Sequence, residues 1–436
     1  MKSKKIKNPL IKRIPKELAG DWKKYLVVFL FLVLTIGFVS GMYVANESML
    51  TAADEGITRY KQEDGHFELK EKADSSLIEA IESGEKADIP GQAEENTADG
   101  DNDDSEENGK SDDDLDNSKK TSVTVYENFF RNEDEDNDND GKSDGTIRVY
   151  AKTDDINLAC LLDGDFPQNE NEIAVDRMHA DNAGMKVGDK ISVSGKEFKI
   201  TGLIAYVNYS TLHEKKTDLM FDAIKFDVAM VTQEGFDRLD KSIHYSYAWK
   251  YDHAPADDIE EKEQSDSFME AMVTQVMLAG NEVEDYTPKY GNPAINFATD
   301  DMGSDKAMGG ILLDILVVII AFIFAVTISN TIANESSAIG TLRALGYTKG
   351  ELVCHYLSMP VIVTLLAAIV GNILGYTVFK NVVVSMYYNS YSLPVYKTIW
   401  NPDAFLKTTV LPVIIMLVVN LIVIVRMMQH TPLQFL

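Results

Sequence analysis

The sequence has 436 residues, of which 45% are hydrophobic and 25% charged, and its formal net charge at pH 7 is −28. This excess of carboxylates excludes a nucleic-acid-binding protein, because neutralising phosphates requires a basic surface. The chain has only two cysteines, so no disulfide framework is expected.

The first 24 residues form a basic segment with nine lysines and arginines. Lys and Arg beside a first membrane span favour the cytoplasmic side, so we predict a cytoplasmic N-terminus. The stretch from Pro9 to Tyr25 mixes apolar and basic residues. It fits either an amphipathic helix lying on the inner leaflet or a positive flank that only sets the topology.

Four apolar segments reach the length of about 20 residues that crosses a hydrocarbon core roughly 30 Å thick. They are residues 25–45, 311–333, 358–379 and 408–425. The alternative for the first is a signal peptide cleaved after Ala45, but its apolar run is longer than an ordinary signal core. We therefore predict a multi-pass protein of the plasma or inner membrane.

The basic N-terminus orients the four crossings. Two regions are then expected outside the membrane, residues 46–310 and the short loop 380–407. Two are expected in the cytoplasm, the loop 334–357 and the tail 426–436. Both termini are predicted to be cytoplasmic.

The large outer region divides by composition. Residues 61–120 are rich in Asp, Glu, Ser, Gly and Asn, and we predict that they are largely disordered. Residues 121–305 alternate short β patterns with turn residues and predict an α+β core domain. Within it, Thr121–Phe130 and Thr146–Thr153 are expected to form a hairpin with an acidic tip.

This tip matches the opening of a calcium loop. Alternating oxygen ligands and a glycine begin at Asp136, and the proposed metal ligands are Asp136, Asp138, Asp140 and Asp144. Ile147 stands where a bidentate carboxylate is required, and no flanking helices are expected. A solvated acidic loop is the alternative.

No motif in the sequence indicates catalysis or nucleotide binding. Gly109-Lys-Ser and Gly141-Lys-Ser resemble the end of a phosphate-binding loop, but the glycines required five positions earlier are Asp104 and Asp136. We therefore expect no enzymatic activity in this chain.

Small residues in two predicted spans indicate close helix packing. Gly37 and Gly41 lie four residues apart in the first span, and Gly371 and Gly375 do so in the third. Glycines at this spacing let helix backbones approach closely. We expect the first and third helices to pack together, within one chain or across a dimer.

The polar segment between the second and third spans is long enough to form its own helix. Ile339, Leu342, Leu345 and Leu352 recur at roughly helical spacing, which predicts an amphipathic helix within Asn334–Glu351. We expect a cytoplasmic partner to bind it.

Several stretches resemble FtsX-like/MacB-like ABC transporter permeases. Ala338–Leu352, read as AIGTLRALGYTKGEL, resembles the loop signature of that family, and Thr431–Leu436 resembles the usual end of its four-helix unit. Four stretches resemble its outer core domain, namely 164–167, 171–175, 187–190 and 198–203. The resemblance implies four transmembrane α-helices plus an exported α+β domain of the MacB-like periplasmic core type.

The resemblance also implies a function. The chain would be a permease subunit without catalysis of its own, while a separate cytoplasmic ABC ATPase binds ATP and Mg²⁺ and docks on the loop helix. The implied coupling residues are Glu335, Ile339, Gly340, Leu342, Arg343, Ala344, Leu345 and Gly346. Ala338 departs from the family, which often has Glu at this position.

Peptides, lipids or lipoproteins are the implied substrates, for export or extraction. The other expected partners are membrane lipid and a second permease copy or a paralogous half. One alternative is a non-transporting mechanotransmitter that regulates a cell-wall hydrolase or a sensor partner. Another is a membrane-anchored binding or signalling protein with an acidic, calcium-binding ectodomain.

Overall fold

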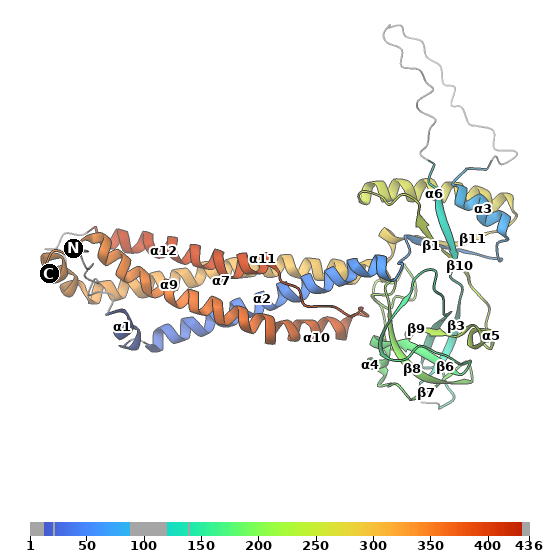
Figure 1. Cartoon of the computed structure of the whole chain (residues 1–436), viewed down its shortest axis with the longest axis horizontal. Helices are drawn as coiled ribbons and strands as arrows, with labels where there is room; N and C mark the ends of the chain where they lie inside the picture. The colour runs from blue at the N-terminus through green and yellow to red at the C-terminus, as the bar shows by residue number, and fades with distance from the viewer. Residues whose placement is uncertain (1–12, 21, 88–119, 138–139, 430–436) are drawn as a thin grey trace, which may run out of the picture. The chain divides into compact units, whose positions relative to one another are not determined.

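The computed structural model describes residues 13–20, 22–87, 120–137 and 140–429. The chain divides into two compact units (Figure 1). The helical unit comprises Met1–Ala52, Asp300–Tyr388 and Tyr396–Leu436, and the mixed unit comprises Ala53–Thr299 and Asn389–Val395.

The helical unit is built from long helices connected by short ones. Its elements in chain order are α1 (Ile14–Gly20), α2 (Trp22–Arg59), α7 (Pro293–Asn334), α8 (Ser336–Ala344), α9 (Lys349–Leu374), the π-helical turn η4 (Gly375–Phe379), α10 (Lys380–Ser390), α11 (Pro402–Phe405), the π-helical turn η5 (Leu406–Val410) and α12 (Leu411–Met427). Four helical stretches of the described chain are long and apolar enough to cross a membrane, as the sequence predicts.

The helical unit has an apolar interior and an apolar exterior. Leu32, Ile36, Phe324, Val363 and Met416, from α2, α7, α9 and α12, are buried in one cluster. Large apolar side chains on the same helices point outward, including Phe31, Phe322, Ile369 and Ile422. Apolar residues all round a helix are typical of a helix in lipid.

Four glycines lie where α2 packs against α9 and η4. A Cβ atom on Gly371 would lie 2.8 Å from Cγ2 of Ile36, and one on Gly375 would lie 2.7 Å from Cβ of Ser40. Facing them, a Cβ on Gly37 would lie 3.2 Å from the carbonyl oxygen of Gly371, and one on Gly41 would lie 2.6 Å from Cβ of Phe379. The backbones of one chain therefore approach closely at all four predicted glycines.

The mixed unit contains two sheets. The smaller is antiparallel, in the order β11 (Val283–Pro288), β1 (Gly65–Leu69), β10 (Tyr245–Tyr251) and β2 (Val123–Glu127). Helices α3 (Ser75–Ser83) and α6 (Asp258–Leu278) cover it (Figure 1). Their shared core includes Phe67, Leu77, Trp249 and Phe268.

The larger sheet has seven strands in the order β5 (Ala159–Gly164), β8 (Lys196–Tyr206), β6 (Glu172–Asp176), β9 (Phe226–Val231), β4 (Gly145–Ala151), β3 (Phe130–Asp136) and β7 (Lys190–Val193). Because β7 also pairs with β8, all strands except β5 close into a ring. Ile147, Val175, Val193 and Phe198 belong to one buried cluster inside this ring. Helices α4 (Arg177–Ala183) and α5 (Gln233–Asp237) pack against the strands.

The predicted disorder of residues 61–120 is wrong for residues 61–87, and residues 88–119 lie outside the described part of the chain. In β1, Phe67 and Leu69 are buried in the core, while Glu68 between them and His66 before them are only partly buried. In α3, Leu77 and Ile81 are one helical turn apart and both are buried. The acidic average of the region hides these two short apolar patterns.

The predicted hairpin also differs in its register. Strand β2 ends at Glu127 and pairs with β10, whereas the hairpin is formed by β3 and β4. Strand β3 therefore runs into the acidic stretch that was expected to be the tip. It does so because Glu133 and Glu135 are fully buried and have partners inside the ring, such as the Ser194 hydroxyl, which donates to Oε2 of Glu133 over 2.5 Å.

The predicted outer loop 380–407 is partly helical, since α10 covers its first residues and α11 and η5 its last. Its middle, Asn389–Val395, belongs to the mixed unit. There Arg177 donates a hydrogen bond to the carbonyl oxygen of Tyr391 over 2.6 Å, and the Ser392 hydroxyl donates to the carboxylate of Asp176.

Candidate functional site

The segment between α7 and α9 forms the short helix α8. Only Glu335 separates α8 from α7, and its φ and ψ of −97° and 14° bend the chain there. After α8, Gly346 adopts φ +99°, a left-handed conformation that glycine takes without steric conflict. A capping box between Thr348 and Glu351 then starts α9.

One face of α8 is bound to the helical unit itself. Ile339 and Gly340 are buried, and Ile339 packs with Ile332 of α7, Leu352 of α9 and Ile424 of α12. Leu342 is partly buried against the same cluster. The spacing of Ile339, Leu342 and Leu352 therefore reflects internal packing, and two of the implied coupling residues, Ile339 and Gly340, lie on the buried side of α8.

The opposite face of α8 is exposed. It is formed by Ser337, Ala338, Thr341, Ala344, Leu345 and Gly346. Most of these side chains are small, but Leu345 is large and 73% exposed. Fully burying a leucine side chain is worth about 1.5–3 kcal/mol, so this face has one residue suited to anchor a protein partner.

Glu335 connects α8 to two other elements. Its Oε2 accepts a hydrogen bond from the Tyr356 hydroxyl of α9 over 2.7 Å and forms an ion pair of 3.1 Å with Arg13, which precedes α1. The backbone of Glu335 also bonds to Thr331 and Ile339, over 3.0 and 2.9 Å. These contacts join α8 to the adjoining ends of α7 and α9.

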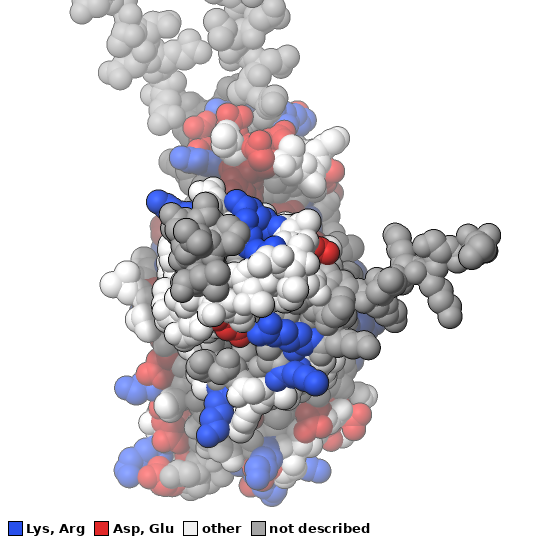
Figure 2. Space-filling model, turned by 90° about the vertical axis from the view of Figure 1, so that its left-hand side faces the viewer, with Lys and Arg blue, Asp and Glu red and all other residues white. Residues whose placement is uncertain are grey.

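Basic residues cluster at this end of the helical unit. Arg343 lies in the last turn of α8, Lys349 begins α9, and Arg426 lies in the last turn of α12. Figure 2 views the molecule from this end, and on the front part that is not grey, basic side chains lie around uncharged ones with few acidic ones among them. This surface is suited to a partner with an apolar centre and acidic margins.

Two of the proposed calcium ligands, Asp136 and Asp144, accept hydrogen bonds from the backbone of their own loop. The carboxylate of Asp136 accepts the backbone N–H groups of Asp140 and Gly141, over 3.1 and 2.9 Å, and Asp144 accepts that of Asn137 over 2.9 Å. Asp138 lies outside the described residues. Among the described residues, the carboxylate and imidazole groups that converge are others, namely Glu135, His179 and Asp227.

Sequence reasoning identified the segment around α8 but missed two residues that hold it. Arg13 was assigned to the basic N-terminal segment and Tyr356 to the cytoplasmic loop 334–357, and neither was given a role in holding α8. No local pattern links either residue to Glu335, because the contacts join positions far apart in the chain.

Comparison with known proteins bears on the C-terminal part of the helical unit and on the segment Asn389–Val395 that it encloses. Residues 310–432 match the family model described as FtsX-like permease C-terminal. The matched segment contains α8 together with the helices before and after it. A comparison with curated proteins finds no match.

Proposed function

We propose that this chain, which carries an FtsX-like permease domain, is the membrane subunit of an ABC transporter and that a cytoplasmic ATPase binds the exposed face of α8. Permeases of the FtsX-like family normally work with such an ATPase. The ATPase would supply the nucleotide site with its Mg²⁺, and this chain would supply the moving part.

The observation that carries the proposal is the two-faced setting of α8. Its inner face is fixed by Ile339, which is fully buried among residues of three long helices, while its outer face exposes Leu345. A partner that presses on the outer face therefore acts on α7, α9 and α12 together. A short helix packed in this way transmits a displacement that a loose loop would absorb.

The motion would reach the mixed unit along the chain. Helices α2 and α7 each contain residues of both units, since α2 spans Trp22–Arg59 and α7 spans Pro293–Asn334. On this proposal both termini lie in the cytoplasm, the mixed unit lies outside, and peptides, lipids or lipoproteins are exported or extracted. A second permease copy or a paralogous half would complete the transporter.

The ATPase is first identified by its co-purification with the full chain. The two proteins are then expressed together to test the proposal. We expect L345D to reduce the vanadate-sensitive ATP hydrolysis recovered with the chain at least tenfold, because a carboxylate would replace the exposed apolar anchor. The control is L219D, since Leu219 is 91% exposed but belongs to the mixed unit. Equal recovery with both variants would refute docking at this face.

Transport itself needs a second experiment. Vesicles containing the complex should move a labelled amphiphilic peptide or a lipid across or out of the membrane only with hydrolysable ATP. ATP hydrolysis that requires Leu345 but moves neither probe would instead support the mechanotransmitter alternative.

A further inference from the structure

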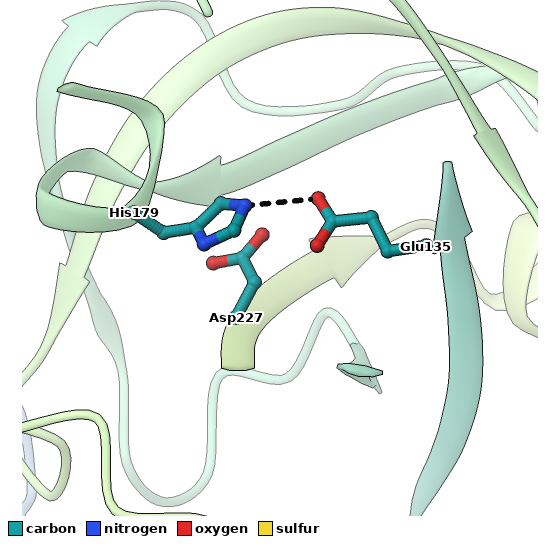
Figure 3. A group of neighbouring side chains, drawn as sticks. All are labelled: Glu135, His179 and Asp227. Carbon is teal, nitrogen blue, oxygen red and sulfur yellow. Dashed lines mark hydrogen bonds and ion pairs between the residues drawn. The ribbon is translucent and has the colours of Figure 1, made fainter. Parts of the chain in front are cut away.

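Three side chains with metal-binding groups meet inside the ring of the mixed unit (Figure 3). Glu135 comes from β3, His179 from α4 and Asp227 from β9. All three are 0% exposed, and one ligand atom from each lies within 4.8 Å of the others. They are the one such group in the described chain.

The strand register explains why two acidic side chains point into the ring. Glu135 is the cross-strand partner of Val193, and Asp227 is that of Ile147. Cross-strand partners lie on the same face of a sheet, and Val193 and Ile147 both belong to the buried core of the ring. Carboxylates at such positions require compensation, because burying an unpaired charge is strongly unfavourable.

His179 is oriented as a metal ligand. Its Nδ1 lies 2.8 Å from the carbonyl oxygen of Ala223, which can only accept a hydrogen bond, so Nδ1 carries a hydrogen. Its Nε2 lies 3.1 Å from Oε1 of Glu135. In a neutral imidazole this Nε2 has a lone pair that would face carboxylate lone pairs, so either a proton or a metal ion must lie between them. A backbone carbonyl that fixes one ring nitrogen is a common second partner of metal-binding histidines.

Two oxygens of the group are left without a partner. Asp227 uses Oδ1 to accept the backbone N–H groups of Asp176 and Val228, over 3.2 and 2.7 Å, and its Oδ2 is buried without a hydrogen bond. Oε2 of Glu135 is buried without one as well. A proton on Nε2 of His179 would satisfy only Oε1 of Glu135 and would leave both oxygens unpaired.

We propose that Glu135, His179 and Asp227 bind one divalent metal ion of the zinc class, through Nε2 of His179 and a carboxylate oxygen from each acidic residue. One imidazole and two carboxylates suit Zn²⁺ or Mn²⁺, whereas Ca²⁺ prefers oxygen ligands alone. Two positive charges also neutralise the two carboxylates. Because the group is closed to solvent, the ion is structural and fastens α4 to β3 and β9.

The site lies beside the residues that hold the segment Asn389–Val395 in place. The residue that precedes α4 is Asp176, whose carboxylate caps α4 and accepts the Ser392 hydroxyl. The next residue, Arg177, donates to the carbonyl oxygen of Tyr391. A metal ion that fixes α4 therefore also fixes the residues that hold this segment.

The test uses the full chain in nanodiscs, purified without chelator and with a tag that lacks histidine. Elemental analysis should find about one zinc or manganese ion per chain. After treatment with a chelator under mildly destabilising conditions, adding Zn²⁺ should raise the Tm by about 5 °C, and Ca²⁺ should leave it unchanged. Metal-free protein whose Tm responds to neither Zn²⁺ nor Mn²⁺ would overturn the proposal and favour a purely protonated cluster.

Variants assign the site. H179Q and D227N should each lose the bound ion and the Tm response to Zn²⁺, whereas H253Q, which changes an exposed histidine, should retain both. The triple variant D136N, D140N and D144N removes three carboxylates of the acidic loop and should also retain the bound ion. Zinc retained by H179Q and D227N, or lost from the loop variant alone, would contradict the assignment.

If H179Q and D227N do not fold, X-ray absorption of the zinc-bound native chain decides the question. It should show nitrogen and oxygen ligands at about 2.0–2.2 Å, including imidazole scattering from one histidine. A spectrum without imidazole scattering, or with several histidines, would overturn the proposal.

Discussion

The hydroxyl of Tyr356 donates a hydrogen bond to Oε2 of Glu335 over 2.7 Å and ties α9 to the single residue between α7 and α8. The same oxygen pairs with Arg13. One carboxylate thus joins the N-terminal segment, the bend before α8 and the helix that follows it. This contact fixes the start of α8 relative to α9.

Removing this hydrogen bond should weaken coupling more than assembly. In Y356F we expect the ATPase to remain bound while the rate of ATP-dependent substrate movement falls several-fold, because α8 would shift without moving α9 to the same extent. The loss of stability should be about 0.5–1.5 kcal/mol. The measurement compares bound ATPase with transport in vesicles, and Y290F, at a partly exposed position of the mixed unit, is the control. Unchanged transport in Y356F would count against a transmitting role for Glu335.

Truncating a side chain on the inner face of α8 should lower stability far more than truncating one on its outer face. I339A should destabilise the helical unit by about 2–5 kcal/mol, because it leaves a cavity among buried residues of α7, α9 and α12. L345A should change stability by less than about 0.5 kcal/mol, since the side chain is exposed. Thermal unfolding in nanodiscs checks both. Comparable losses in the two variants would contradict the assignment of inner and outer faces.

Adding one methyl group where α2 contacts the end of η4 and the start of α10 should push these segments apart. In G41A the new Cβ would lie 2.6 Å from Cβ of Phe379 and 2.7 Å from the backbone nitrogen of Lys380, so backbone must move. We expect a lower Tm and loss of activity. The control is G303A in α7, where no atom lies within 4 Å of the added Cβ. That change should be neutral or stabilising by up to about 1 kcal/mol, because alanine favours helix.

The mixed unit should lose stability as the pH rises above neutral. Nδ1 of His66 lies 2.7 Å from Oε1 of the buried Glu63. Burial alone lowers the pKa of His66, but the charge and the hydrogen bond of Glu63, helped by Asp285 and opposed by Arg148, raise it above 6.5 overall. A folded-state pKa above the unfolded value stabilises the protein fully below pH 6.5, and this stabilisation is lost as the pH rises through the folded-state value.

Urea unfolding followed by tryptophan fluorescence at pH 6 and above pH 8 measures this effect. The native chain should be less stable at the higher pH, and H66Q should reduce the difference. An equal pH dependence in H66Q would show that another group is responsible.

The parts of the fold that depend on local pattern could be predicted from the sequence. Long apolar runs predicted the four spans. The spacing of Gly37, Gly41, Gly371 and Gly375 predicted a close approach of the first and third helices, where a larger side chain would not fit. The periodicity of Ile339, Leu342 and Leu345 predicted one apolar face on α8, but in the structure Leu345 lies on the exposed side. In the structure, residues of three other helices cover Ile339, and only the folded chain brings them there.

The remaining features depend on contacts between distant positions. The apolar residues of β1 and α3 are few and lie in an acidic stretch, so averaging over composition concealed them. Strands β7 and β8 form a hairpin through the two-residue turn Ser194-Gly195, which is a local signal. Closure of the ring also needs β7 to pair with β3, which no local signal specifies. Glu135, His179 and Asp227 lie on three separate elements, so they have no motif spacing to recognise.

The most direct test of the account places a photo-crosslinking amino acid at single positions of α8 in cells that contain the ATPase. Position 345 should crosslink to the ATPase, because Leu345 is exposed on the outer face. Position 339 should instead crosslink within the chain, because Ile339 is buried among its own helices. Crosslinking of the ATPase at position 339, or at neither position, would contradict the proposal that the outer face of α8 receives the ATPase.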